Sequence, residues 1–141
     1  MKHEWKKQEK GFYATKQMEG VWKQKQGDDL VKDELEYTIM IRQPDFITES
    51  MACKAMEAVK KKKPNPLYEE IRFDTMQDGK YIEILHIGAF DDEPASFEKM
   101  TQVAKKNNLE RDKSCHREIY LNNANRVEKS KLKTILRFSV K

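Results

Sequence analysis

The chain has 141 residues, a length that fits one domain with a modest hydrophobic core. Its 28 basic and 24 acidic residues are mixed along the chain and give a formal charge of +4, without the concentrated basic stripe of a nucleic-acid binder. No apolar run approaches the roughly 20 residues that cross a bilayer, and the two cysteines lie outside any CxxC spacing, so we expect a cytoplasmic protein that contacts neither membrane nor nucleic acid.

The N-terminal part of the chain predicts a loosely held arm followed by two strands. Residues 1–18 are polar and form the expected arm, which leaves residues 19–141 for the folded domain. A short strand is expected at 19–23, and a turn at 24–28 leads to a second strand at 34–43.

A helix is expected next, from Thr48 to about Lys63. Thr48 is a favoured N-cap residue, and Glu49 places an acid in the first turn, where the helix dipole stabilises it. Four consecutive lysines, residues 60–63, precede Pro64 and indicate the solvated last turn of this helix.

Asp78-Gly79 is a preferred two-residue hairpin turn and predicts a pair of strands around it. The two strands would span about Glu69–Gln77 and Lys80–Gly88. In that register their apolar residues form one patch, which His86 borders. We expect His86 to be packed or hydrogen-bonded rather than to bind a ligand.

The sequence Asp-Asp-Glu-Pro at residues 91–94 opens a second helix that runs to about Asn107. The apolar stripe of this helix comprises Phe97, Met100, Val103 and Ala104.

Two final strands complete the predicted order, at His116–Leu121 and Thr134–Val140. The order ββ-α-ββ-α-ββ indicates an α+β domain in which two helices pack on one face of an antiparallel sheet. The opposite face would remain open for a ligand or a partner.

The first of these strands carries the most informative pattern. Its alternation places His116, Glu118 and Tyr120 on one face, and Arg117, Ile119 and Leu121 on the other. Because Ile119 and Leu121 can be buried against helices, the three polar side chains should point at the open face. There they could bind a cation or move a proton. The alternative is an exposed carboxylate paired with a lysine or arginine, which is worth less than about 1 kcal/mol.

Aromatic residues strengthen the first of these interpretations. A carboxylate at Glu118 that is bordered by Tyr120, Tyr37 and Trp22 would attract flat cations through charge and aromatic contact.

Motifs for other chemistries are absent from the sequence. It has no glycine-rich phosphate loop, no HExxH and no paired CxxC, and His3, His86 and His116 share no metal-ligand spacing. We therefore expect no cofactor and no metal site.

Four segments in a characteristic order carry a family resemblance. They are Tyr37–Phe46, Leu85–Glu98, His116–Leu121 and Lys131–Arg137. Together with Glu4–Lys10 near the start, they resemble the GyrI-like small-molecule-binding family over nearly all of the chain from Glu19 to Val140.

The resemblance implies two βαββ repeats around a pseudo-twofold axis, with a ligand groove between them. Family members include drug-sensing domains of multidrug transcription regulators, stand-alone sequestering proteins, and hydrolases that open cyclopropane-bearing DNA-alkylating toxins. Glu118 fits a glutamate that lies in the family's groove, and Trp22 and Tyr37 resemble aromatic groove positions. Tyr120 and His116, on the strand of Glu118, complete the predicted ligand-binding site.

The chain departs from the family pattern near its start. Relatives have a strand and a long helix between the N-terminal block and the segment that begins at Glu19, whereas here only Gly11 to Met18 join the two. We therefore expect about one and a half repeats, with the first strand and helix of repeat one absent. The sheet surface that this would expose predicts self-association as a homodimer.

Three functions fit these observations. The first is uptake of aromatic, cationic or electrophilic drug- or toxin-like compounds. The second is hydrolysis of cyclopropanoid toxins, with Glu118 orienting or deprotonating a water and Tyr120 polarising the leaving oxygen. The third is a degenerate remnant that acts through protein–protein contact.

Overall fold

A computed structural model describes residues 15–24 and 35–141 of the chain. The structure divides into two compact units, one of which contains Arg42–Gln77 while the other combines Gln17–Ile41 with Asp78–Lys141. Most of the predicted N-terminal arm and of the turn at 24–28 lies outside the described residues.

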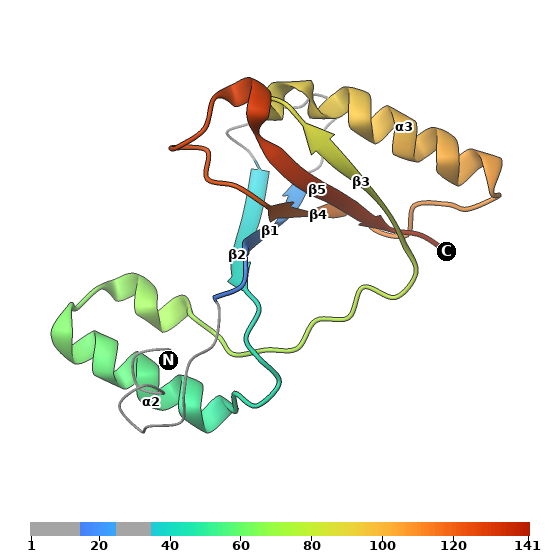
Figure 1. Cartoon of the computed structure of the whole chain (residues 1–141). Coiled ribbons are helices and arrows are strands. Elements are labelled where there is room, and N and C mark those ends of the chain that lie inside the picture. Colours follow the sequence, from blue (N-terminus) through green and yellow to red (C-terminus); the bar gives the residue numbers. More distant parts are fainter. Residues whose placement is uncertain (1–14, 25–34) are drawn as a thin grey trace. The chain divides into compact units, whose positions relative to one another are not determined.

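The larger unit is built on an antiparallel sheet. Over the described residues the sheet has five strands in the order β2-β1-β4-β5-β3 (Figure 1). The strands are β1 (Met18–Gln24), β2 (Leu35–Ile41), β3 (Tyr81–Ile87), β4 (Cys115–Tyr120) and β5 (Lys133–Ser139). The helices are α2 (Glu49–Lys62) and α3 (Glu93–Lys106), with short 3-10 turns at Pro66–Glu70, Phe90–Asp92 and Lys129–Lys131. The predicted α+β class is thus confirmed.

Helix α3 covers the β3–β5 side of this sheet and creates the hydrophobic core (Figure 1). Pro94 lies in its first turn, and the left-handed Asn108, with φ of 54°, follows its end. Met100 packs against three buried side chains of the C-terminal strand and the residue after it, which are Leu136, Phe138 and Val140. The predicted apolar stripe of α3 is wrong at Val103, which is about half exposed.

Helix α2, in the smaller unit, has the predicted ends. It begins after Thr48, whose hydroxyl accepts a hydrogen bond from the backbone N–H of Met51, and it ends at Lys62 with three lysines in its last turn. None of the helices in the described part of the chain has the length and apolar character needed to cross a membrane.

The predicted hairpin around Asp78-Gly79 is wrong, although its second strand is confirmed as β3. Residues 71–80 form no strand, and within the described residues β3 pairs with β5 alone. Ile82 and Ile84 lie opposite Phe138 and Leu136, so the apolar side of β3 is already covered by the core. Gly79 has a positive φ of 69°, a conformation that glycine adopts without strain.

The carboxylate of Asp78 instead holds two arginines on the side of the sheet away from α3. Arg117 and Arg137 lie directly opposite each other on β4 and β5, where two like charges repel. Both donate to Oδ2 of Asp78, at 2.6 and 2.7 Å. Glu19 accepts from Arg117 at 2.8 Å, and Glu83 accepts from Arg137 at 2.8 Å. We call this side, marked by Arg117 and Arg137, the arginine face, and the side that bears Glu118 and Leu136 the α3 face.

The core on the α3 face predicts a large effect of Leu136→Ala. Leu136 is fully buried, so its truncation should lower the free energy of unfolding by about 2–5 kcal/mol through lost burial and a residual cavity. Leu85→Ala is the matched control, because Leu85 is half exposed on the neighbouring strand and its loss should cost about 0.5 kcal/mol or less. Urea unfolding curves compare the two, and equal midpoints would contradict this account of the core.

Candidate functional site

The polar residues of β4 point toward α3, not toward an open face. Directly opposed residues of an antiparallel pair share a face, and Glu118 lies opposite the buried Leu136 of β5. The ring of His116 meets the ring of Phe97 on α3, with centroids 4.7 Å apart. The predicted position of Glu118 on an uncovered sheet face is therefore wrong, while a ligand groove stays a prediction. The predicted burial of Ile119 and Leu121 against helices is also wrong, because Ile119 lies on the arginine face and Leu121 is exposed. Alternation separates two faces but does not tell which one a helix covers.

The carboxylate of Glu118 is buried and accepts a hydrogen bond at each oxygen. Its side chain is only 8% exposed. Nε2 of His116 lies 2.8 Å from Oε1, and the hydroxyl of Tyr120 donates to Oε2 over 2.8 Å. Since a carboxylate oxygen accepts, Nε2 of His116 carries the hydrogen. The alternative of an exposed Glu118 paired with a lysine or arginine is therefore wrong.

A second strand extends this hydrogen-bonded group. The indole Nε1 of Trp22, on β1, donates to the Tyr120 hydroxyl at 2.9 Å. That hydroxyl thus accepts from Trp22 and donates to Glu118. Trp22, Tyr120, Glu118 and His116 together form what we call the Glu118 cluster.

The hydroxyl of Tyr120 remains a donor at neutral pH. Burial raises the pKa of this phenol well above its ordinary value, and the negative charge of Glu118 raises it further. The phenol therefore keeps its proton, which the contact with Oε2 of Glu118 requires.

Aromatic surface extends from the Glu118 cluster toward solvent. The ring of Tyr37 on β2 lies against Trp22, with centroids 5.0 Å apart and a tilt of 32°. Tyr37 is 62% exposed. Phe90 meets the ring of Tyr120 edge-on at 6.1 Å. All five predicted site residues are thus neighbours, and their role in ligand binding stays a prediction.

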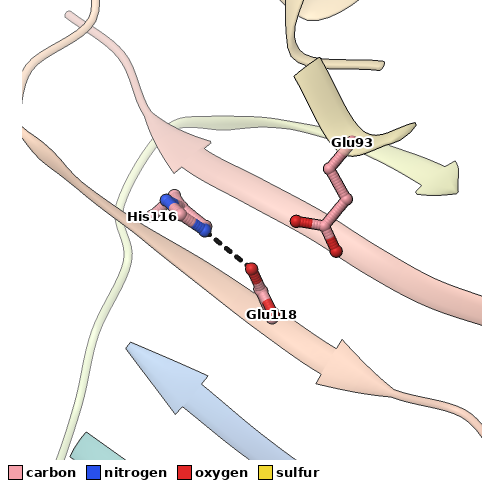
Figure 2. A group of neighbouring side chains, drawn as sticks. All are labelled: Glu93, His116 and Glu118. Carbon is pink, nitrogen blue, oxygen red and sulfur yellow. Dashed lines mark hydrogen bonds and ion pairs between the residues drawn. The ribbon is translucent and has the colours of Figure 1, made fainter. Parts of the chain in front are cut away.

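Two residues of this region were not predicted as site residues. Gly20 lies opposite Glu118, and a Cβ there would come within 2.8 Å of Nε1 of Trp22 and 3.1 Å of the Tyr120 hydroxyl. Glu93, in the first turn of α3, is buried and brings a second carboxylate to His116 and Glu118 (Figure 2). From the sequence, Glu93 is an acid in the first turn of a helix, where the helix dipole stabilises it. Only the fold reveals its neighbours.

His86 holds the start of α3 against the sheet, as a packed and hydrogen-bonded histidine was expected to do. Its Nε2 lies 2.8 Å from the carbonyl oxygen of Ala89, and its Nδ1 lies 2.8 Å from the hydroxyl of Ser96 on α3. Because a carbonyl only accepts, Nε2 donates and the Ser96 hydroxyl donates to Nδ1. These two bonds fix the end of α3 that carries Glu93.

A hollow of about 520 Å³ lies elsewhere on the sheet and does not contain the Glu118 cluster. It is open to solvent and is lined by Val21, Lys23, Glu36, Tyr37, Thr38 and Cys115. Of the predicted site residues only Tyr37 reaches it. The candidate site is defined by the convergent hydrogen bonds around Glu118 and not by this hollow.

A family model described as the GyrI-like small molecule binding domain matches residues 2–141. The chain belongs to the GyrI-like family. This result confirms the resemblance of its four sequence segments and is consistent with the α+β fold. The comparison with curated proteins returns no match.

Solved structures from Listeria innocua are similar to this GyrI-like chain. One is an uncharacterized conserved protein, with 30% identity and a TM-score of 0.86. Two others are described as hydrolases, with 28% and 29% identity and TM-scores of 0.82 and 0.84. Each match covers 93% of this chain.

The chain spans about two thirds of those solved structures, since the matches cover 66%, 65% and 66% of their lengths. If this chain has lost a strand and a helix from repeat one, its relatives should be longer, as these solved structures are. That loss stays a prediction, because the segment before Met18 lies largely outside the described residues.

The hydrogen bonds of the Glu118 cluster predict a specific cost for Tyr120→Phe. This change removes the donor to Glu118 and the acceptor for Trp22, so it should lower the free energy of unfolding by about 1–3 kcal/mol. It should also shift the indole N–H resonance of Trp22 in a ¹H–¹⁵N spectrum.

Tyr37→Phe is the matched control, because it deletes a hydroxyl from a largely exposed tyrosine that also touches Trp22. If Tyr120→Phe changed the free energy of unfolding and the Trp22 resonance no more than Tyr37→Phe does, the hydrogen bonds of Tyr120 would not hold the cluster together.

Proposed function

We propose that this GyrI-like domain binds aromatic small molecules that are cationic or electrophilic, with Glu118 supplying the charge. The observation that carries the proposal is the buried Glu118 carboxylate beside the rings of Tyr120, Trp22 and Tyr37. The exposed ring of Tyr37 would receive a flat ligand first, and the ligand's charged or electron-poor part would then approach Glu118.

Charge and aromatic contact favour the same class of ligand. Among the described residues Glu118 has no lysine or arginine partner, so its charge is stabilised by two hydrogen bonds alone. A buried carboxylate in this state gains from a ligand cation, because attraction between charges is stronger away from water. The faces of Trp22 and Tyr37 add cation–π attraction of about 0.5–2 kcal/mol.

Hydrolysis of a strained electrophile is the second candidate function, and the Tyr120–Glu118 pair favours it. Glu118 would take a proton from a water that replaces one of its two donors, and the water oxygen would bond to a carbon of the strained ring. The ring bond would break, and its electron pair would move onto a conjugated carbonyl oxygen. The Tyr120 hydroxyl, released from Glu118 when the water takes its place, would donate to that oxygen. The proton held by Glu118 would then pass to the same oxygen, so the product is the substrate plus one water and Glu118 is again a carboxylate. Two similar solved structures are described as hydrolases.

The setting that we propose is the cytoplasm, where binding would sequester a toxic compound. Cys53 and Cys115 are free thiols, which fits a reducing compartment. Effector binding for a transcription regulator and self-association as a homodimer stay predictions. The described part of the α3 face does expose apolar side chains on β1 and β2, including Met18 and Ile39.

Ligand binding can be measured through Trp22 in a Trp5→Phe background, which leaves one indole in the chain. A planar cationic aromatic dye should quench this fluorescence saturably. Glu118→Gln should weaken the affinity about tenfold to a hundredfold, since a charged contact of about 1.5–3 kcal/mol is lost. A neutral dye of the same shape should bind more weakly and be insensitive to this substitution.

Glu98→Gln is the matched control, because Glu98 is an exposed acid on α3. Equal affinity for the cationic dye in Glu118→Gln and Glu98→Gln would contradict the role of Glu118. No saturable quenching by any dye, in a protein with a normal circular dichroism spectrum, would favour a remnant that acts through protein contact.

Turnover separates the enzyme from the binding protein. With a cyclopropanoid electrophile, the second candidate predicts a product heavier by one water, detected by mass spectrometry. Glu118→Gln should slow its formation by at least about 100-fold, as expected for loss of a general base. A rate no higher than in buffer would remove the enzyme function and leave the binding function intact.

A further inference from the structure

Three side chains under the N-terminal end of α3 gather around one point. Glu93 reaches down from α3, while His116 and Glu118 stand two residues apart on β4 (Figure 2). Each offers one ligand atom, and these atoms all lie within 4.8 Å of one another. Both glutamates are buried: taken as whole residues, Glu93 is 8% exposed and Glu118 is 6% exposed.

One imidazole and two carboxylates are a donor set for a divalent transition metal. Nitrogen with oxygen ligands suits Zn²⁺ or Mn²⁺, whereas Mg²⁺ and Ca²⁺ prefer oxygen alone. Metal–ligand bonds of about 2.0–2.1 Å place neighbouring ligand atoms roughly 3 Å apart. Nε2 of His116 and Oε1 of Glu118 are already 2.8 Å apart, and a bound ion would replace the hydrogen on Nε2, with the neutral ring then carrying its hydrogen on Nδ1. Glu93, which sits on a flexible side chain, would close the third position.

The neighbours of these residues are those that orient metal ligands. Tyr120 donates to the outer oxygen of Glu118 and is itself fixed by Trp22. The edge-on contact with Phe97 holds the ring of His116. Hydrogen bonds and packing of this kind set the direction of a ligand atom and strengthen metal binding.

The charge of the group also favours a cation. Two carboxylates that lie close together under a helix repel each other, and burial strengthens the repulsion. A divalent cation between them would replace this repulsion by attraction to both.

We propose that Glu93, His116 and Glu118 form a binding site for a divalent transition-metal ion such as Zn²⁺ or Mn²⁺. From the sequence we expected no metal site, because the histidines share no ligand spacing. The ligands here come from two elements that only the fold brings together. This metal site goes beyond the proposed function, because binding of the ion requires no aromatic ligand. The proposal is tested with the metal ion alone.

Calorimetric titration of the full chain with Zn²⁺ should show saturable binding of about one ion per chain. Mn²⁺ should lose its free-ion electron paramagnetic resonance signal in the same ratio. Glu93→Gln and His116→Asn should each weaken binding at least about tenfold, while Glu98→Gln on the same helix should leave it unchanged. Circular dichroism confirms that each variant is folded.

A ¹⁵N spectrum of the histidine rings tests the site in the unmodified protein, even if a variant fails to fold. Zn²⁺ should shift the resonances of His116 and leave those of His86, which is held by Ser96 and Ala89, unchanged. The proposal is overturned by the absence of saturable binding up to millimolar metal. It is equally overturned by undiminished affinity in folded Glu93→Gln, or by a shift confined to another histidine.

Discussion

β4 is paired along both edges, and this double pairing decides which side chains meet. On one edge, β1 brings Gly20 and Trp22 opposite Glu118 and His116, and on the other, β5 brings Leu136 opposite Glu118. A slip of one residue would exchange the two faces and move every one of these side chains to the wrong side. The register thus sets both the core and the place of the buried carboxylate.

The two faces of the sheet use opposite means of stabilisation. On the α3 face, apolar packing around Met100 excludes water, and this makes the hydrogen bonds to Glu118 necessary. On the arginine face, Asp78 joins two facing arginines that would otherwise repel each other. Because His86 ties α3 to β3, the helix that excludes water also delivers Glu93 to Glu118. Stability and the candidate chemistry therefore share the same contacts.

Local signals predicted most of the elements, and long-range contacts account for what was missed. The Thr48 cap of α2 and Pro94 in the first turn of α3 lie within a few residues of each helix start, so the sequence was sufficient to place these starts. The Asp78-Gly79 pair is also a local signal, but it could not reveal that distant arginines bind the aspartate. Alternation grouped His116, Glu118 and Tyr120 correctly, yet the covered face follows from where α3 packs. Glu93 and Gly20 join the site through pairings and packing that no spacing encodes.

The Glu118 cluster depends on the absence of a side chain at Gly20. The indole of Trp22 and the phenol of Tyr120 meet in the space that a side chain at position 20 would fill. A related sequence with any larger residue at this position could retain Trp22, Glu118 and Tyr120 and still have to shift the indole or the phenol out of this arrangement. When other chains of this family are compared, the presence of a glycine at this point of β1 is as informative about shared chemistry as the presence of the glutamate itself.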